Sequence, residues 1–194
     1  MIEREAKKTI LEVSEAFKVL LVTGPRQVGK TTLLKSIMPE NMNYVTLDDE
    51  NLRTMAQEDP KLFLEEHKAP LLIDEVQYAP NLFSYIKIKV DNENKPGMYW
   101  LTGSQQFKLM KNVQESLAGR VGIVRLNSFT YSEINKKAET KEIFNPKKIV
   151  KSELIDVNTL YEYIFKGGMP ELYNNDKMKR EYFFNSYIET YLTR

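Results

Sequence analysis

The chain has 194 residues, with 28 basic and 27 acidic side chains, so its formal net charge is only +1. This balance argues against a general attraction to nucleic acids or to membrane surfaces. The sequence has no cysteine and one histidine, His67, which excludes disulfides, thiolate metal sites and histidine-rich metal sites.

The length is sufficient for one core domain with a small appendage. The N-terminus does not resemble a signal peptide, and no apolar run approaches the length that a membrane span requires. From the sequence we expect a soluble cytoplasmic protein without a membrane partner.

The chain begins with a pattern that is typical of an amphipathic helix, over residues 3–17. The apolar residues that fall near one face of this helix are Ile2, Ala6, Ile10, Val13 and Phe17. Residues 19–23 are mostly aliphatic and partly β-branched, which predicts a buried strand.

The segment after this strand matches the phosphate-binding pattern G-x-x-x-x-G-K-[ST] at every fixed position. Its residues are Gly24, Pro25, Arg26, Gln27, Val28, Gly29, Lys30, Thr31 and Thr32. A helix is predicted next, over residues 31–38, and it stops at Pro39. Strand, glycine loop and helix are the context that the pattern requires, so we predict that this loop binds a nucleoside triphosphate.

The residue types in the loop suit this chemistry. Gly24 and Gly29 let the backbone curl so that successive N–H groups face a phosphate, where the helix also presents its positive dipole end. Lys30 can reach the β- and γ-phosphates, and the Thr31 hydroxyl can hold Mg²⁺.

A second strand is predicted over residues 44–47, and three acidic residues follow it: Asp48, Asp49 and Glu50. Acidic side chains suit a helix N-terminus, so we expect them to cap a helix around 50–57 rather than to bind metal. Pro60 starts a further short helix.

The third predicted strand, residues 71–73, leads directly into Asp74 and Glu75. An acidic pair after three apolar residues is by itself usually a solvated strand end. With the phosphate loop upstream it becomes the Walker B signal, in which Asp belongs to the Mg²⁺ shell and Glu polarises the attacking water. We therefore predict Asp74 and Thr31 as metal ligands and Glu75 as a catalytic residue.

A helix over residues 80–90 and a fourth strand over 98–104 are predicted next. Because ligands of open α/β sheets lie at the carboxyl ends of the strands, Thr102, Ser104 and Gln105 could contact the γ-phosphate or the attacking water. We keep Ser104 as a catalytic candidate, although a plain strand-ending turn is an equally good interpretation.

A helix that ends at Gly119 leads to Arg120 and to a fifth strand over residues 121–126. Thr130 and Glu133 have the spacing of a capping box, which predicts the start of another helix. The core domain is expected to close there.

Residues 136–155 are rich in lysine and show no clear period, which favours a solvated face over a basic binding patch. The lysines concerned are Lys147, Lys148 and Lys151. A helix is predicted near 158–166, before Gly167, and an aromatic-rich helix from about 177 to 194.

Several of these segments together resemble the prokaryotic AAA-type ATPases that carry a C-terminal DUF4143 domain. They are GPRQVGKTTL (24–33), YVTLDDE (44–50), LIDEVQYAP (72–80), LTGSQQF (101–107), ESLAGRV (115–121) and GGMPE (167–171). The resemblance runs from about residue 3 to the end of the sequence.

The resemblance implies an α/β fold of the P-loop NTPase type, with a five-stranded parallel sheet of order 5-1-4-3-2 flanked by helices. It implies an ATPase core over 1–135, a helical lid region over 136–175 and, over 176–194, the start of a C-terminal domain that is mostly missing here. ATP and Mg²⁺ are the implied cofactors, and Mg²⁺-dependent hydrolysis of ATP to drive a remodelling step is the implied reaction.

AAA-type ATPases commonly place an arginine in the region of Arg120 that reaches the γ-phosphate of a neighbouring subunit. Such a role would make the active species a homo-oligomer and Arg120 a catalytic residue. An equally good interpretation is that Arg120 ties the helix end to a nearby carboxylate such as Glu115.

Three other functions stay open. Asp74-Glu75-Val76-Gln77 is similar to a GTPase switch segment, but Asn94-Lys95-Pro96-Gly97 lacks the Asp that guanine selection needs. A nucleic-acid-associated assembly module is a further alternative, although the balanced charge argues against direct DNA binding. A small-molecule kinase would also use a phosphate loop, but the Asp-Glu pair favours hydrolysis.

Overall fold

The computed structural model describes residues 2–104, 107–136 and 155–192. The contacts within the chain divide it into two compact units. The core unit comprises Ala6–Asn127, and the second unit comprises Met1–Glu5 together with Ser128–Arg194. The sequence places the end of the core at residue 135, and its lid and C-terminal labels remain predictions.

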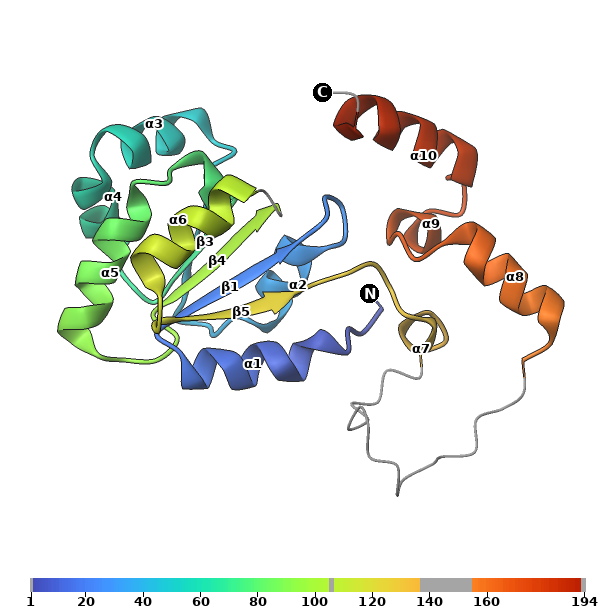
Figure 1. Cartoon of the computed structure of the whole chain (residues 1–194), viewed down its shortest axis with the longest axis horizontal. Helices are drawn as coiled ribbons and strands as arrows, with labels where there is room; N and C mark the ends of the chain where they lie inside the picture. The colour runs from blue at the N-terminus through green and yellow to red at the C-terminus, as the bar shows by residue number, and fades with distance from the viewer. Residues whose placement is uncertain (1, 105–106, 137–154, 193–194) are drawn as a thin grey trace, which may run out of the picture. The chain divides into compact units, whose positions relative to one another are not determined.

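The core unit contains a five-stranded sheet (Figure 1). Its strands are β1 (Val19–Gly24), β2 (Asn43–Thr46), β3 (Leu71–Asp74), β4 (Tyr99–Ser104) and β5 (Val121–Arg125). The strand order is β2-β3-β4-β1-β5, and each neighbouring pair is parallel. The predicted P-loop fold and its strand order are therefore confirmed.

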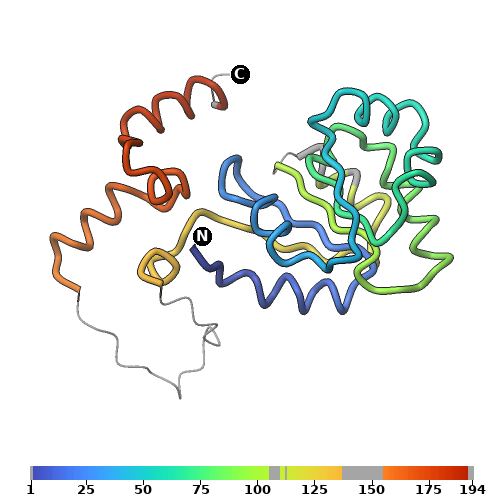
Figure 2. The backbone as a smooth tube through the Cα atoms, turned by 180° about the vertical axis from the view of Figure 1, so that it is seen from behind, coloured from blue at the N-terminus to red at the C-terminus, as the bar shows by residue number. Residues whose placement is uncertain are grey.

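Helices cover both faces of the sheet. They are α1 (Ala6–Ala16), α2 (Lys30–Ile37), α3 (Glu50–Glu58), α4 (Pro60–Glu66), α5 (Leu82–Glu93) and α6 (Phe107–Leu117), with a 3₁₀ turn, η1 (Val76–Tyr78), after β3. Figures 1 and 2 view the sheet from opposite sides, with α6 in front of it in the first and α2 in front of it in the second.

Burial on both faces explains why the central strands are continuous apolar runs. All residues of β1, β3 and β4 are buried. Alternate strand residues join one cluster with the apolar residues of α3 to α6: Val19, Leu21, Leu71, Ile73, Tyr99 and Leu101. The intervening side chains are also buried and face the opposite way, because successive strand residues alternate between faces.

Most element boundaries agree with the sequence prediction, and the differences have local causes. Asp49 caps α3 by accepting hydrogen bonds from two backbone N–H groups, as predicted. The helix predicted from residue 80 begins at Leu82, and the unpredicted turn η1 lies between β3 and this helix. Within the described residues, no helix is long and apolar enough to cross a membrane.

The second unit contains α7 (Tyr131–Ile134), α8 (Val157–Lys166), α9 (Glu171–Asn174) and α10 (Arg180–Tyr187), which continues as a π-helical turn, η2 (Ile188–Leu192). The predicted capping box at the start of α7 is present. Helix α9 was not predicted. The predicted basic residues of 136–155, Lys147, Lys148 and Lys151, lie outside the described residues.

A buried ion pair organises the start of this unit. The Arg4 guanidinium donates from Nε to Glu133 Oε1 at 3.0 Å, and the backbone N–H of Glu5 donates to the same oxygen at 2.8 Å. The guanidinium also lies 4.8 Å from the ring centroid of Phe129. Because Glu133 is part of the capping box, the N-terminal residues and α7 share one carboxylate.

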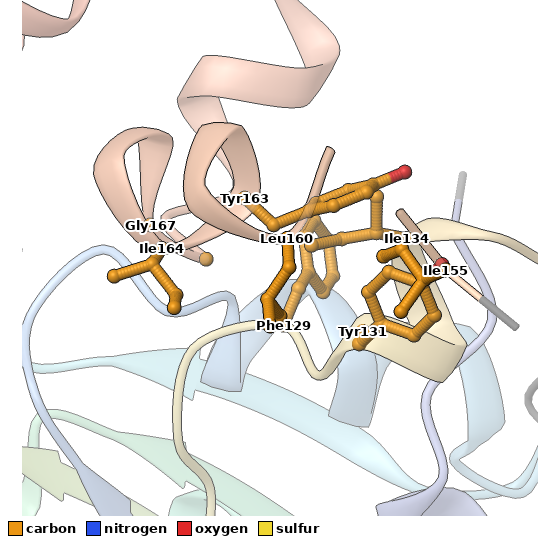
Figure 3. A pocket seen from close by; sticks show the side chains of 9 residues that line it. Phe129, Tyr131, Ile134, Ile155, Leu160, Tyr163, Ile164 and Gly167 are labelled. Atoms are coloured by element: carbon orange, nitrogen blue, oxygen red, sulfur yellow. The ribbon is translucent and has the colours of Figure 1, made fainter. Parts of the chain in front are cut away.

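An apolar pocket of about 300 Å³ lies in the second unit (Figure 3). It is lined by residues of α7, α8 and the adjoining turns: Phe129, Tyr131, Ile134, Ile155, Leu160, Tyr163, Ile164, Gly167 and Gly168. Tyr131 and Tyr163 meet edge to face across it, with ring centroids 4.7 Å apart. At Gly168 a Cβ atom would lie 2.3 Å from the Phe129 carbonyl oxygen, so only glycine fits.

Candidate nucleotide-binding site

The predicted site residues gather at the carboxyl edge of the sheet. Gly24 pairs with Ser104 in the register of β1 and β4, and Ile73 pairs with Leu101 in the register of β3 and β4. The three strands therefore end side by side, and the phosphate loop leaves β1 at this edge (Figure 1). In open α/β sheets this is where ligands bind.

The loop between β1 and α2 has the curled backbone that the pattern predicts. Gly24 has φ 152°, Gln27 has φ 61° and Gly29 has φ 89°. A Cβ atom on Gly24 would lie 2.0 Å from the Leu126 carbonyl oxygen, so this position requires glycine for space as well as for conformation. The left-handed backbone at Gln27 has no signal in the sequence, because glycine or asparagine usually occupies such a position.

Lys30 is the buried cation of the loop, with 6% of its surface exposed. Its ammonium donates to the carbonyl oxygens of Gly24 at 3.1 Å and Pro25 at 2.8 Å. An ammonium has three donors, so Lys30 can hold the loop and still donate to a phosphate. Burial lowers the pKa of Lys30, an effect that the nearby carboxylates of Glu75 and Asp74 oppose.

The Asp74 carboxylate joins the phosphate loop to the third and fourth strands. Its Oδ1 accepts a hydrogen bond from the Thr31 hydroxyl at 2.8 Å and another from the Thr102 hydroxyl. The Tyr44 hydroxyl donates to Oδ2 at 3.4 Å. The two residues that the sequence predicts as metal ligands, Thr31 and Asp74, are thus in direct contact.

Thr102 connects both members of the acidic pair to β4. While its hydroxyl donates to Asp74, the same oxygen accepts from the backbone N–H of Glu75 at 3.2 Å. Among the described contacts, Thr102 bonds to protein groups, whereas the sequence suggested a contact with the γ-phosphate or the attacking water, which stays a prediction. Strand register was the missing information, because it decides which β4 residue lies beside Asp74.

Ser104 lies at the end of β4 and is fully buried. Its Oγ has no hydrogen-bond partner among the residues that the structure describes, and Thr23 Oγ1 on the neighbouring strand also has none. Buried hydroxyls usually have a partner. These two unsatisfied groups therefore suit a site that receives a polar ligand. Gln105, the other candidate at this strand end, lies outside the described residues.

Arg120 lies away from this cluster, at the start of β5. Val19 pairs with Val121, so Arg120 is at the amino edge of the sheet, roughly 17 Å along β1 from Gly24 at about 3.3 Å per residue. Its Nε and Nη2 donate to the two oxygens of Asp91 at 2.6 and 2.9 Å. The carboxylate partner is Asp91 and not the suggested Glu115, which pairs with Lys111.

The donor set fits a magnesium nucleotide better than a protein-caged metal. Within the described part of the chain, no group of three or more His, Cys, Asp or Glu side chains could hold a metal ion. Mg²⁺ is commonly bound by one or two protein oxygens together with substrate phosphates and waters. The Thr31 hydroxyl and the Asp74 carboxylate provide such oxygens beside Lys30 and the curled loop.

Comparison with curated proteins finds relatives of greater length. The chain is 34% identical over 136 residues to the uncharacterized protein Rv2008c of Mycobacterium tuberculosis, and equally to the uncharacterized protein Mb2031c of Mycobacterium bovis. The match covers 70% of this chain and 31% of each relative. The chain thus spans about a third of the length of these proteins.

One solved structure in particular shares the fold. DnaA from Aquifex aeolicus, determined with bound AMPPCP, aligns with a TM-score of 0.53 at 16% identity, over 94% of this chain and 59% of that one. The Walker-type ATPase PABY2304 of Pyrococcus abyssi aligns with a TM-score of 0.46 at 16% identity, over 70% of this chain and 57% of the other. A family model described as an AAA domain, AAA_14, matches residues 16–135, which include the loop, the acidic pair and β4. The chain therefore belongs to this AAA domain family of P-loop ATPases.

Proposed function

We propose that the chain binds ATP with Mg²⁺ and hydrolyses it to ADP and phosphate, in order to drive a conformational or remodelling step. The observation that carries this proposal is the hydrogen-bonded chain from Thr31 through Asp74 and Thr102 to the backbone of Glu75. These hydrogen bonds link the phosphate loop to Glu75, whose carboxylate a protein that only binds nucleotide would not need.

Each residue has a role that follows from its position. The loop N–H groups and Lys30 would bind the β- and γ-phosphates, and Thr31 and Asp74 would hold Mg²⁺. Bound Mg²⁺ would supply charge neutralisation at the phosphate oxygens. The unsatisfied Ser104 hydroxyl would donate to a γ-phosphate oxygen or to the attacking water.

Glu75 would act as the general base. Water attacks the γ-phosphorus, the bond from that phosphorus to the bridging oxygen breaks, and the proton of the water passes to the Glu75 carboxylate. The Glu75 carboxylate opposes the effect of burial on the pKa of Lys30, which supports a site shared by the base and the phosphate-binding cation. Base and ligand functions are thereby divided between two neighbouring residues.

This division can be tested by comparing Glu75→Gln with Asp74→Asn. We expect Glu75→Gln to bind Mg²⁺-ATP with parental affinity in calorimetry while phosphate release falls by about 10²–10⁴-fold, because the amide cannot accept a proton. Asp74→Asn should weaken ATP binding in the presence of Mg²⁺ and change it little in EDTA.

Two outcomes would contradict the assignment. Parental turnover by Glu75→Gln would exclude Glu75 as the base. A parent chain that binds ATP but releases no phosphate would instead favour the nucleotide-dependent switch or assembly module. Measuring GTP beside ATP in the same experiment tests the GTPase-like form of that alternative.

A further inference from the structure

The residue two positions after Glu75 makes an unexpected contact with it. The side-chain amide of Gln77 donates from Nε2 to Glu75 Oε2. The opposite amide orientation would place the Gln77 oxygen against a carboxylate oxygen, which is repulsive, so the donor must face Glu75. The general base of the proposed reaction is therefore held by a neutral donor from its own turn.

The backbone geometry that brings the two side chains together is unusual. Glu75 has φ 56° and ψ 43°, a left-handed conformation that non-glycine residues seldom adopt. The chain then forms the single turn η1, in which Tyr78 N–H donates to the Glu75 carbonyl at 3.1 Å. Such backbone strain persists only where the surrounding structure fixes it, and it is common at active sites.

The surroundings fix this turn at both ends. At its start, the Glu75 N–H donates to Thr102 on β4. At its end, Gln57 of α3 donates to the Tyr78 carbonyl at 2.5 Å, and the Arg53 guanidinium lies 4.4 Å from the Tyr78 ring centroid. The backbone that carries Gln77 is thus anchored to both the sheet and α3.

We infer that Gln77 is a positioning residue that holds the Glu75 carboxylate toward the attacking water. The Glu75 backbone is bonded to Thr102, which also bonds to Asp74, so the Glu75 side chain begins beside the proposed Mg²⁺ ligand. With Oε2 engaged by Gln77, the carboxylate loses rotational freedom, and Oε1 becomes the oxygen that receives the proton. A hydrogen bond to a charged group is strong enough to select one rotamer.

This inference rests on the proposed hydrolysis and adds a residue to it. The contact distinguishes Gln77 from a water-orienting glutamine of the GTPase type, because one N–H of its amide is bonded to the base itself. Its amide acts on the base, so its loss should slow the chemical step without weakening nucleotide binding.

The decisive variant is Gln77→Met, which preserves length and removes the donor. We expect kcat for ATP to fall about tenfold, with KM and the calorimetric affinity for Mg²⁺-ATP unchanged. Gln114→Met is the matched control, because it makes the same replacement on the exposed surface of α6 and should have parental kinetics. A kcat of Gln77→Met equal to that of the parent would overturn the inference.

A double-mutant cycle separates positioning from general damage to the turn. Glu75→Asp shortens the acid and withdraws it from the Gln77 amide, so Gln77→Met should cost much less in that background than in the parent. If the two losses multiply independently, Gln77 does not act through Glu75.

A spectroscopic measurement tests the contact between Gln77 and Glu75 even if the chain does not hydrolyse ATP. In ¹H–¹⁵N spectra of the whole chain, the side-chain NH₂ signal of Gln77 should lie downfield and should shift in Glu75→Ala. An unchanged signal would exclude the contact. A parent chain that shows the shift but no ATP hydrolysis would instead overturn the proposed function, so the two failures are distinguishable.

Discussion

The two units of the chain bury their apolar residues to very different extents. In the core unit, β1, β3 and β4 are buried throughout, and the apolar residues of α3 to α6 pack against them. In the second unit, helix α8 has no buried residue, and Val157, Tyr161 and Phe165 are each 64–66% exposed. The core is stabilised by its own sheet, whereas the second unit depends on a few specific contacts.

The same contrast separates the candidate nucleotide site from the contacts within the second unit. The residues that form the candidate nucleotide site belong to the core unit. The contacts that stabilise the second unit are of another kind, namely a buried ion pair and edge-to-face contacts between aromatic rings. Changes in the two units should therefore have separable effects, and three variants test this separation.

The largest effect is expected from Lys30→Ala in the core. Removal of the buried ammonium should abolish measurable ATP binding in calorimetry, because the backbone of the loop alone holds the phosphates weakly. Lys61→Ala, which removes an exposed lysine of α4, should keep parental affinity. Unchanged ATP affinity of Lys30→Ala would contradict the site.

An intermediate effect is expected from Glu133→Ala in the second unit. The change leaves the buried Arg4 guanidinium without this partner and removes one half of the capping box. Loss of one member of a buried pair costs about 3–5 kcal/mol, so unfolding of the second unit should shift to clearly lower denaturant.

The informative control for Glu133→Ala is ATP binding. The affinity should stay at the parental value, because this variant leaves every residue of the candidate site intact. If the affinity falls together with the stability, the two units are energetically coupled and the contrast between them is wrong.

The smallest effect is expected from Arg120→Ala. Its bidentate partner Asp91 is exposed, and the guanidinium holds the pKa of Asp91 below its usual value. Exposed ion pairs contribute little to stability, so the melting temperature should fall slightly and turnover per chain should stay near parental.

A mixing experiment tests the alternative role of Arg120. If Arg120→Ala is inactive and its mixture with inactive Glu75→Gln recovers activity, the arginine acts on a neighbouring subunit. Its position at the amino edge of the sheet and its engagement by Asp91 favour the structural role.

The sequence predicted the elements that are specified by residues close together in the chain. The pattern from Gly24 to Thr32 specifies both a loop shape and a chemistry, and the apolar runs before it and before Asp74 specify buried strands. Thr130 and Glu133 cap α7 as their spacing predicts. In each case neighbouring residues contain all the information.

Features that depend on distant partners were not predicted. The role of Thr102 depends on which residue of β3 lies beside it. Arg120 forms its ion pair with Asp91 because α5, which carries Asp91, ends near the start of β5. The contact of Gln77 with Glu75 is local and was missed for another reason: it depends on the left-handed backbone of Glu75, a conformation that glutamate seldom adopts. Sequence spacing does not encode the contacts of Thr102 and Arg120, because these contacts arise from the packing of the sheet and its helices.

The second unit consists of two separate stretches of the sequence, and this has a consequence for folding during synthesis. This unit joins Met1–Glu5 to residues from Ser128 onward, so the core sequence is inserted between its parts. Because chains emerge from the ribosome N-terminus first, Arg4 is made long before Glu133. The core can fold while Arg4 still lacks this partner, and the second unit closes last. Replacement of Arg4 would therefore disturb the stage of folding that assembles the second unit, after the core unit has formed.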